Sequence, residues 1–222
     1  MNKKSSKKTT KKTSKKTSKK DLPIIHILAS SGSGKTTLGL KLKEYSNKFA
    51  IIELDDIDDP IALKLLDNPN MLKLALSKKE KDNKEFFDTK DKKGVIQINK
   101  LIKKYQKENK IVVLTGLSID IKKIPITDKY YINIDPEQLF RQFNLRTLDD
   151  IVKNYKEIRT LIENENPEKI NNILLFKYKL RGKFLANYNM IAKNSKDGIE
   201  KNKDYKLMFF DEIFNDIISK YG

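Results

Sequence analysis

The chain has 222 residues, no cysteine and a single histidine. Without cysteine it has no disulfide framework, no zinc–thiolate site and no thiol nucleophile. No apolar run reaches the about 20 residues that span a bilayer, and the N-terminus lacks the hydrophobic segment of a secretory signal. These absences predict a soluble intracellular protein, cytoplasmic, nuclear or carried in a virion, that is neither secreted nor inserted in a membrane.

Arginine is scarce as well. The chain has 47 basic residues, and only four are arginines: Arg141, Arg146, Arg159 and Arg181. Where lysine is the default, an arginine is expected at tasks that lysine performs badly, such as bidentate recognition of phosphate. Arg141 and Arg146 are therefore candidate phosphate ligands, and the alternative is that they are surface residues of a basic protein.

The formal net charge of +17 is concentrated at the N-terminus. Lysine doublets separated by Ser and Thr recur every four residues and supply ten of the charges within the first twenty residues. This tail has no apolar residue after Met1, so residues 1–21 are predicted to be disordered and residues 22–222 to form one domain. Three roles are open for the tail. It binds nucleic acid or an acidic partner electrostatically, acts as a nuclear localisation signal, or serves as a solubilising extension.

The segment from Ala29 to Thr37 reads Ala-Ser-Ser-Gly-Ser-Gly-Lys-Thr-Thr and fits the phosphate-loop pattern G-x-x-x-x-G-K-[ST], with Ala29 in place of the first glycine. An apolar strand-like run precedes it, and an amphipathic helix-like stretch follows it. The pattern predicts a nucleotide-binding loop made of the following residues: Ser30, Ser31, Gly32, Ser33, Gly34, Lys35, Thr36 and Thr37.

Each residue type in this loop has a physical role. Gly32 and Gly34 permit backbone conformations closed to other residues, so that backbone N–H groups can surround an anion. Lys35 is expected to reach the β- and γ-phosphates, and Thr36 to offer its hydroxyl to Mg²⁺. The alternative is a merely flexible Ser/Gly turn.

Apolar runs alternate with amphipathic stretches along the rest of the chain. Strands are predicted near residues 24–29, 49–54, 111–114, 130–134 and 205–208. Helices are predicted after the phosphate loop, from Pro60 with Asp59 as N-cap, around 95–105, over 136–145, over 148–162, from Pro167, and over 213–221. This alternation predicts an α/β fold of three layers, with a parallel sheet of about five strands whose carboxyl ends form the site.

Together the loop and the element order resemble the P-loop nucleoside and nucleotide kinase group, which includes small-metabolite kinases such as shikimate and gluconate kinases. The resemblance implies the P-loop NTPase fold, ATP with Mg²⁺, and a mobile helical lid over about 136–185. It implies that Asp55 and Asp56, after the second strand, bind the acceptor or assist its deprotonation. It also implies that Arg141 and Arg146 clamp the transferring phosphoryl group, with Arg159 a looser candidate.

The chain departs from that group after the strand 111–114. Many P-loop proteins place a magnesium-directed aspartate there, where this chain has Thr115-Gly116. Asp55 is the expected substitute as metal ligand. Asp58 and Asp59 are interpreted as a strand end and helix cap, and His26, within an apolar strand, as a structural residue.

The predicted function is an ATP-dependent phosphotransferase for a small acceptor such as a nucleoside, a nucleotide or a sugar acid. Lys35, Asp55, Arg141 and Arg146 are the predicted catalytic residues. Two alternatives stay open. One is an enzyme acting on nucleic acid, such as a polynucleotide 5′-hydroxyl kinase, and the other is a nucleotide-binding regulatory protein without catalysis.

Overall fold

The computed structural model describes residues 22–77, 79–164 and 188–222. Three predictions lie outside the described residues: the tail 1–21, the helix from Pro167 and the position of Arg181. The predicted lid, 136–185, is described only as far as residue 164.

Five strands form one parallel sheet in the order β2-β3-β1-β4-β5. They are β1 (Ile24–Leu28), β2 (Phe49–Glu53), β3 (Ile111–Thr115), β4 (Asp128–Ile132) and β5 (Lys206–Met208). Every residue of β1 and of β3 is buried, as expected of strands covered on both faces. The predicted parallel sheet of five strands is confirmed.

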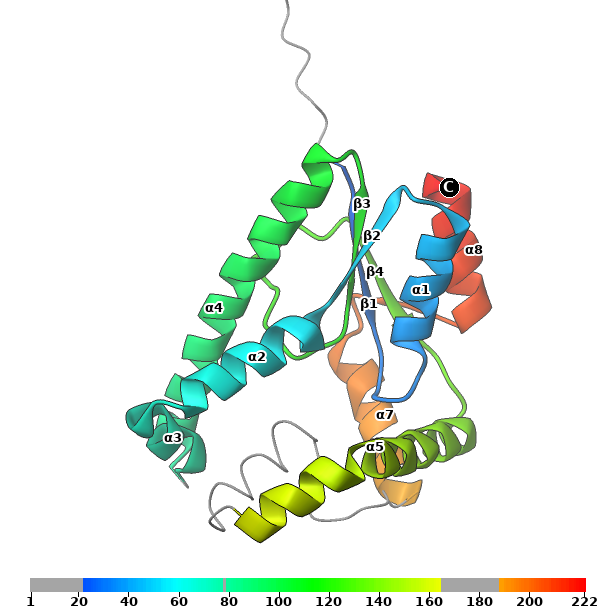
Figure 1. Cartoon of the computed structure of the whole chain (residues 1–222). Helices are drawn as coiled ribbons and strands as arrows, with labels where there is room; N and C mark the ends of the chain where they lie inside the picture. The colour runs from blue at the N-terminus through cyan, green and yellow to red at the C-terminus, as the bar shows by residue number, and fades with distance from the viewer. Residues whose placement is uncertain (1–21, 78, 165–187) are drawn as a thin grey trace, which may run out of the picture.

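Helices cover both faces of the sheet (Figure 1). They are α1 (Lys35–Tyr45), α2 (Leu54–Leu66), α3 (Pro69–Leu76), α4 (Glu80–Lys107), α5 (Pro136–Asn164), α7 (Tyr188–Lys201) and α8 (Phe210–Tyr221). The predicted three-layer α/β/α arrangement is confirmed. Within the described part of the chain, no helix combines the length and the apolar character needed to cross a membrane.

Two cores lie on opposite faces of the sheet. Ile25 and Ile27 of β1 pack in one cluster with residues of α1 and α8, including Leu38 and Ile213. Ile24 packs in a second cluster, together with residues of α2 and α4. Successive strand side chains point to opposite faces, so β1 anchors both layers of helices.

The helix predicted to begin at Pro60 begins six residues earlier. α2 starts at Leu54, with Glu53 at its N-cap position and Pro60 inside the helix, so the prediction of Asp59 as N-cap is wrong. Leu54 and Ile57 lie three residues apart on one face of the helix, and both are buried in the core with α4. Because this apolar face is buried, α2 begins directly after β2. Pro60 deprives the carbonyl of Asp56 of its helical partner, but Asp56 is exposed to water.

The region after β3 also differs from the prediction. β4 begins at Asp128 and ends at Ile132, two residues earlier than expected. Asp135 then starts α5, because its Oδ1 accepts hydrogen bonds from the backbone N–H groups of Glu137 (2.8 Å) and Gln138 (3.1 Å). The two helices predicted over 136–145 and 148–162 are one continuous helix, since no glycine or proline interrupts it.

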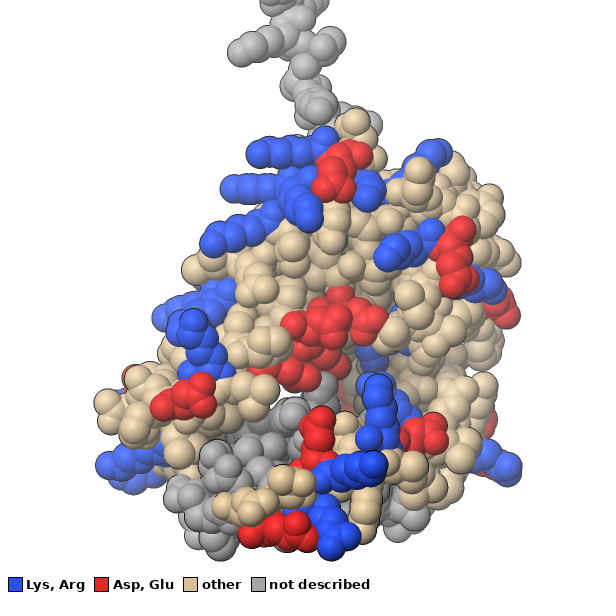
Figure 2. All heavy atoms as spheres, in the orientation of Figure 1, with Lys and Arg blue, Asp and Glu red and all other residues tan. Residues whose placement is uncertain are grey.

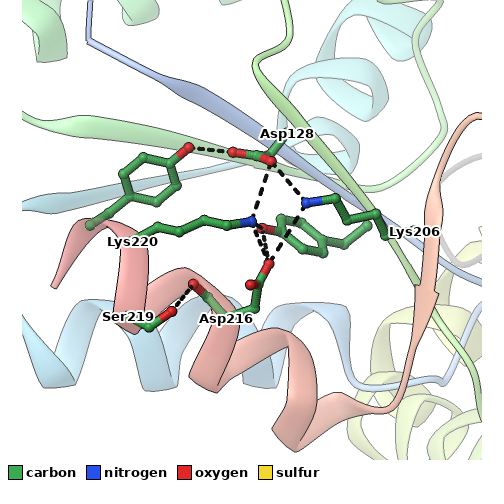
Figure 3. A network of polar contacts seen from close by, with 7 residues as sticks. Asp128, Lys206, Asp216, Ser219 and Lys220 are labelled. Carbon is green, nitrogen blue, oxygen red and sulfur yellow. Dashed lines mark hydrogen bonds and ion pairs between the residues drawn. The ribbon is translucent and has the colours of Figure 1, made fainter.

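A polar network ties α8 to the amino end of β4, at the edge of the sheet opposite the phosphate loop (Figure 3). Lys220 Nζ lies 2.6 Å from Asp216 Oδ2 and donates to Tyr130 Oη at 3.0 Å, while Lys206 Nζ lies 3.3 Å from Asp128 Oδ1. Burial alone would raise the pKa of Asp128, but hydrogen bonds from Tyr221 and Lys206 outweigh it and lower that pKa. The network therefore holds α8 against the sheet.

His26, in the middle of β1, is buried and hydrogen-bonded on both ring nitrogens. Its Nε2 lies 2.8 Å from the carbonyl oxygen of Gly116, and its Nδ1 lies 2.6 Å from Tyr205 Oη. A carbonyl only accepts, so Nε2 carries the proton and Nδ1 accepts from the tyrosine hydroxyl. Burial lowers the pKa of His26 to about 4, which keeps the ring neutral.

The pKa of His26 makes a testable contribution to acid unfolding. The unfolded histidine gains its proton near pH 6.5, whereas the folded one stays neutral down to about pH 4, so stability falls as pH drops through this window. We expect the wild type to lose up to roughly 3 kcal/mol more unfolding free energy than His26→Gln between pH 7 and 4. Urea denaturation at several pH values measures this, and parallel pH profiles for both proteins would contradict it.

Candidate functional site

The loop between β1 and α1 has the backbone of an anion-binding turn. Gly32 and Gly34 adopt φ angles of +85° and +89°, and Gly34 is the N-cap residue of α1. Ser33 folds back on the loop, with its hydroxyl donating to the Ser30 carbonyl at 2.7 Å. The first turn of α1 contains no acidic side chain, so the N-terminal N–H groups of this helix and its dipole present a positive end to the loop.

Lys35 lies over the mouth of this loop. Its Nζ donates to the carbonyl oxygens of Ala29 at 3.1 Å and Ser30 at 3.0 Å. The ammonium is therefore held at the carboxyl end of β1, the end of the strand at which ligands of open parallel sheets bind.

Thr36, the residue expected to bind Mg²⁺, donates its hydroxyl to Glu53 Oε2 at 3.0 Å. Glu53 is the last residue of β2 and the register partner of Thr115 in β3. A carboxylate thus lies beside the Thr36 hydroxyl, although Thr115 itself offers none. Glu53 was not predicted as a site residue, because its only signal in the sequence is that it ends an apolar strand.

These oxygen atoms suit a magnesium ion that arrives with a nucleotide. Mg²⁺ prefers oxygen ligands and is usually bound through one or two carboxylates plus phosphate oxygens. Thr36 and Glu53 supply a hydroxyl and a carboxylate in contact. No group of three or more His, Cys, Asp or Glu suitable for a metal is found among residues 22–77, 79–164 and 188–222. The assignment of Asp55 as metal ligand stays a prediction.

A cavity of about 850 Å³ extends from the phosphate loop to α2 and α4. Its volume is in the range of small-molecule sites. Asp55, Asp58 and Asp59 line it together with Lys35, and Figure 2 shows acidic side chains gathered over the start of α2. Asp56 is exposed and is not among the lining residues, so the structure brings only one of the two predicted acceptor-binding aspartates to the cavity.

Gly116 lies beside the start of α2 in a left-handed conformation. Its φ is +110°, and a Cβ built on it would lie 3.5 Å from the Leu54 Cβ and 3.8 Å from Asp55 Oδ1. Any other residue would be strained in this conformation. The strand end at Gly116 therefore lies close to Asp55.

A buried ion pair closes the far end of the cavity. Lys90 Nζ lies 2.6 Å from Asp58 Oδ1, and the two side chains are only 7% and 12% exposed. Burial raises the pKa of Asp58 despite the hydrogen bond and the charge of Lys90. The prediction of Asp58 at a strand end is wrong, because β2 ends at Glu53 and Asp58 lies inside α2. Lys90 was not predicted, because nothing in its lysine-rich surroundings distinguishes it.

The arginines of α5 lie on different sides of the helix. A Cβ on Gly32 would lie 3.2 Å from the Cα of Phe143, so the phosphate loop packs against α5 at this point. Arg146, three residues after Phe143, lies on nearly the same face, whereas Arg141, two residues before it, lies on the opposite one. The Arg141 guanidinium pairs with Glu137 at 2.5 Å and is 70% exposed. Neither arginine is among the lining residues of the cavity.

Arg159, the looser candidate, lies further along α5. Its Nε pairs with Glu163 Oε1 at 2.7 Å, four residues on, and both side chains are mostly exposed. An exposed pair of this kind adds little to stability. The structure does not bring Arg159 to the phosphate loop.

Comparison with known proteins adds no relative: the chain matches no family model, and no curated protein sequence matches it.

The close approach of Gly32 to α5 can be tested by substitution. We expect Gly32→Ala to destabilise the protein by about 1–2 kcal/mol, because the residue is left-handed, and also to push α5 away from the loop. Hydrogen exchange should then show faster exchange in the first half of α5.

Gly34→Ala is the matched control for this experiment. It has the same left-handed strain, but its Cβ would meet only the ring of Phe210, at an ordinary 3.6 Å. Equal exchange of α5 in the two variants would show that the loop does not support the helix.

Proposed function

We propose that this protein is an ATP-dependent phosphotransferase acting on a small acceptor. The observation that carries the proposal is the polarity of one cavity. Lys35 and a helix N-terminus lie at one end, and the α2 carboxylates Asp55, Asp58 and Asp59 line the part beyond it. This division suits a triphosphate on the first side and a hydroxyl donor on the second.

In the proposed reaction the acceptor hydroxyl attacks the γ-phosphorus of ATP. The bond from the γ-phosphorus to the bridging oxygen breaks, ADP leaves, and the hydroxyl proton passes to Asp55. Lys35 balances charge on the transferring group, and the backbone N–H groups from Gly32 to Thr36 hold the phosphates. Mg²⁺, held by Thr36 with Glu53 or Asp55, would supply further neutralisation of phosphate charge.

The proposed roles of Lys35 and Arg146 are separable by substitution. Lys35→Ala should weaken MgATP binding by about 10- to 150-fold, because it removes a hydrogen bond to a charged group. Arg146→Ala should leave binding within about threefold but lower turnover by about 10³-fold, as expected of an arginine that acts on the transition state. Calorimetry and a radiolabelled-ATP assay with nucleosides, nucleotides and sugar acids measure both effects.

Arg141→Ala is the matched control, since Arg141 pairs with Glu137 on the opposite face of α5. A turnover defect in Arg141→Ala but not in Arg146→Ala would reverse the arginine assignment. Nucleotide binding without phosphorylation of any acceptor would instead favour the non-catalytic nucleotide-binding protein.

Lysines of α4 favour a second candidate function, action on nucleic acid. Lys93, Lys100, Lys103, Lys104 and Lys107 are exposed. At 3.6 residues per turn they fall within an arc of about 100° and span about 21 Å. No acidic residue occurs between Lys92 and Lys107, and basic side chains gather over this part of α4 in Figure 2.

The lysine-rich tail joins the domain at the same end of α4. Gln106 Nε2 donates to the carbonyl oxygen of Leu22 at 3.1 Å, and Leu22 is the first described residue after the tail. The tail and the α4 lysines together suit the phosphates of a single-stranded nucleic acid.

Salt dependence tests this surface. Each neutralised phosphate of a single strand contributes about −0.7 to the slope of log K against log salt. Replacing Lys100, Lys103, Lys104 and Lys107 by Gln should therefore reduce the slope for a labelled oligonucleotide by about 3. The control variant of equal charge carries Gln in place of four lysines that are exposed on α5 and α7: Lys153, Lys156, Lys193 and Lys196. Equal losses in both variants would exclude a specific α4 surface.

A further inference from the structure

Tyr131, near the end of β4, directs its hydroxyl group to the cavity that contains the phosphate loop. The residue is only 4% exposed, and it lines this cavity. Within residues 22–77, 79–164 and 188–222, the Tyr131 hydroxyl has no hydrogen-bond partner. A phenol hydroxyl both donates and accepts, so this group is available to a ligand in the cavity.

Gly198 of α7 leaves the space that the Tyr131 hydroxyl occupies. A Cβ built on Gly198 would lie 2.5 Å from Tyr131 Oη and 3.5 Å from its Cζ, so a side chain at this position would displace the ring. Gly198 lines the cavity as well. The hydroxyl therefore lies at the point where β4 and α7 meet in the cavity wall.

Two amide side chains extend this wall along α7. Asn194 and Asn202 lie four residues before and four residues after Gly198, and both line the cavity. Residues at this spacing share one face of a helix. Asn202 Nδ2 donates to the carbonyl oxygen of Gly198 at 2.8 Å, so its Oδ1 is the atom that can accept a hydrogen bond from a ligand.

The wall formed by β4 and α7 differs in charge from the wall opposite. Its described lining residues are Tyr131, Asn194, Gly198 and Asn202, which are all uncharged. The charged lining residues belong to other elements: Lys35 to α1, Lys90 to α4, and Asp55, Asp58 and Asp59 to α2. The cavity therefore has one charged side and one uncharged side that offers hydrogen bonds.

The uncharged wall lies on the side of the sheet that α2 covers. Tyr130 donates to Asp216 of α8 at 2.7 Å, on the face that α1 and α8 cover. Successive strand side chains point to opposite faces, so Tyr131 points away from α1 and toward the cavity that α2 lines. The phosphate loop leads into α1, so this position suits contact with the acceptor better than contact with the nucleotide.

We propose that Tyr131 is a specificity-determining residue of the phosphotransferase, whose hydroxyl hydrogen-bonds to an uncharged polar group of the acceptor, such as a hydroxyl, carbonyl or amide. Asn194 and Asn202 bind neighbouring polar groups on the same side of the acceptor. The reacting hydroxyl of the acceptor faces Asp55 on the opposite wall. This inference rests on the proposed function and adds the residues that hold the acceptor from its second side.

Tyr131→Phe in the full chain tests the role of the hydroxyl. With the acceptor that the wild type phosphorylates best among nucleosides, nucleotides and sugar acids, we expect the acceptor KM to rise about 3- to 10-fold, the value of one hydrogen bond. The MgATP KM should stay within about twofold. The melting temperature should not change, because the hydroxyl has no hydrogen bond to a described residue.

Tyr45→Phe is the matched control. It removes a hydroxyl from a tyrosine that is 57% exposed at the end of α1, and it should leave both KM values unchanged. An unchanged acceptor KM in an active Tyr131→Phe enzyme, or an equal rise in the MgATP KM, would overturn this proposal alone. A wild type that binds MgATP but phosphorylates no acceptor would overturn the proposed function and this proposal with it.

Gly198→Ala tests whether the Tyr131 hydroxyl lies against α7. In the wild-type background the new Cβ must displace the ring, so the melting temperature should fall and the acceptor KM should rise. In the Tyr131→Phe background the contact at 2.5 Å is removed and Cζ, at 3.5 Å, is an ordinary neighbour. Alanine is favoured over glycine in a helix, so the melting temperature should then rise. An equal fall in both backgrounds would contradict the placement of the hydroxyl and overturn the proposal.

Discussion

The turn between β1 and α1 depends on two residues in the left-handed region of backbone space. With Gly32 and Gly34 at positive φ, the chain leaves the central strand of the sheet and starts α1 within six residues. The same turn directs the N-terminus of α1 into the cavity, sets Lys35 over the loop carbonyls and brings the loop against α5 at Phe143. Another residue at either position would strain the turn, and at Gly32 it would also crowd Phe143 of α5.

The site lies where neighbouring strands send their connections to opposite faces of the sheet. β1 leads into α1 on one face, while the chain after β3 packs with α2 and α4 on the other. Such a divergence opens a crevice at the carboxyl ends of parallel strands. His26 of β1 stabilises one wall of this crevice, because its Nε2 donates a hydrogen bond to the carbonyl oxygen of Gly116, the residue that follows β3. A neutral buried side chain thus fixes the wall between the phosphate loop and the start of α2.

Features that depend on local sequence were predictable. A few neighbouring residues suffice to recognise the buried runs of β1 and β3 and the glycines of the phosphate loop. These local patterns predicted the parallel sheet and the position of the loop. The start of α2 was not predictable, because the local Asp59-Pro60 signal is outweighed by burial of Leu54 and Ile57 against α4. Tyr131 and Gly198 were not predicted as site residues, because they lie on separate elements far apart in the chain and meet only when it folds.

The central claim is that the phosphate loop holds the triphosphate of a nucleotide, and a crystal structure with Mg²⁺ and a non-hydrolysable ATP analogue tests it most directly. The account predicts that the phosphates lie against the backbone N–H groups from Gly32 to Thr36 and that Lys35 turns from the Ala29 and Ser30 carbonyls to the phosphate oxygens. An ordered nucleotide bound elsewhere, or Lys35 still on those carbonyls with the loop empty at saturating analogue, would contradict it.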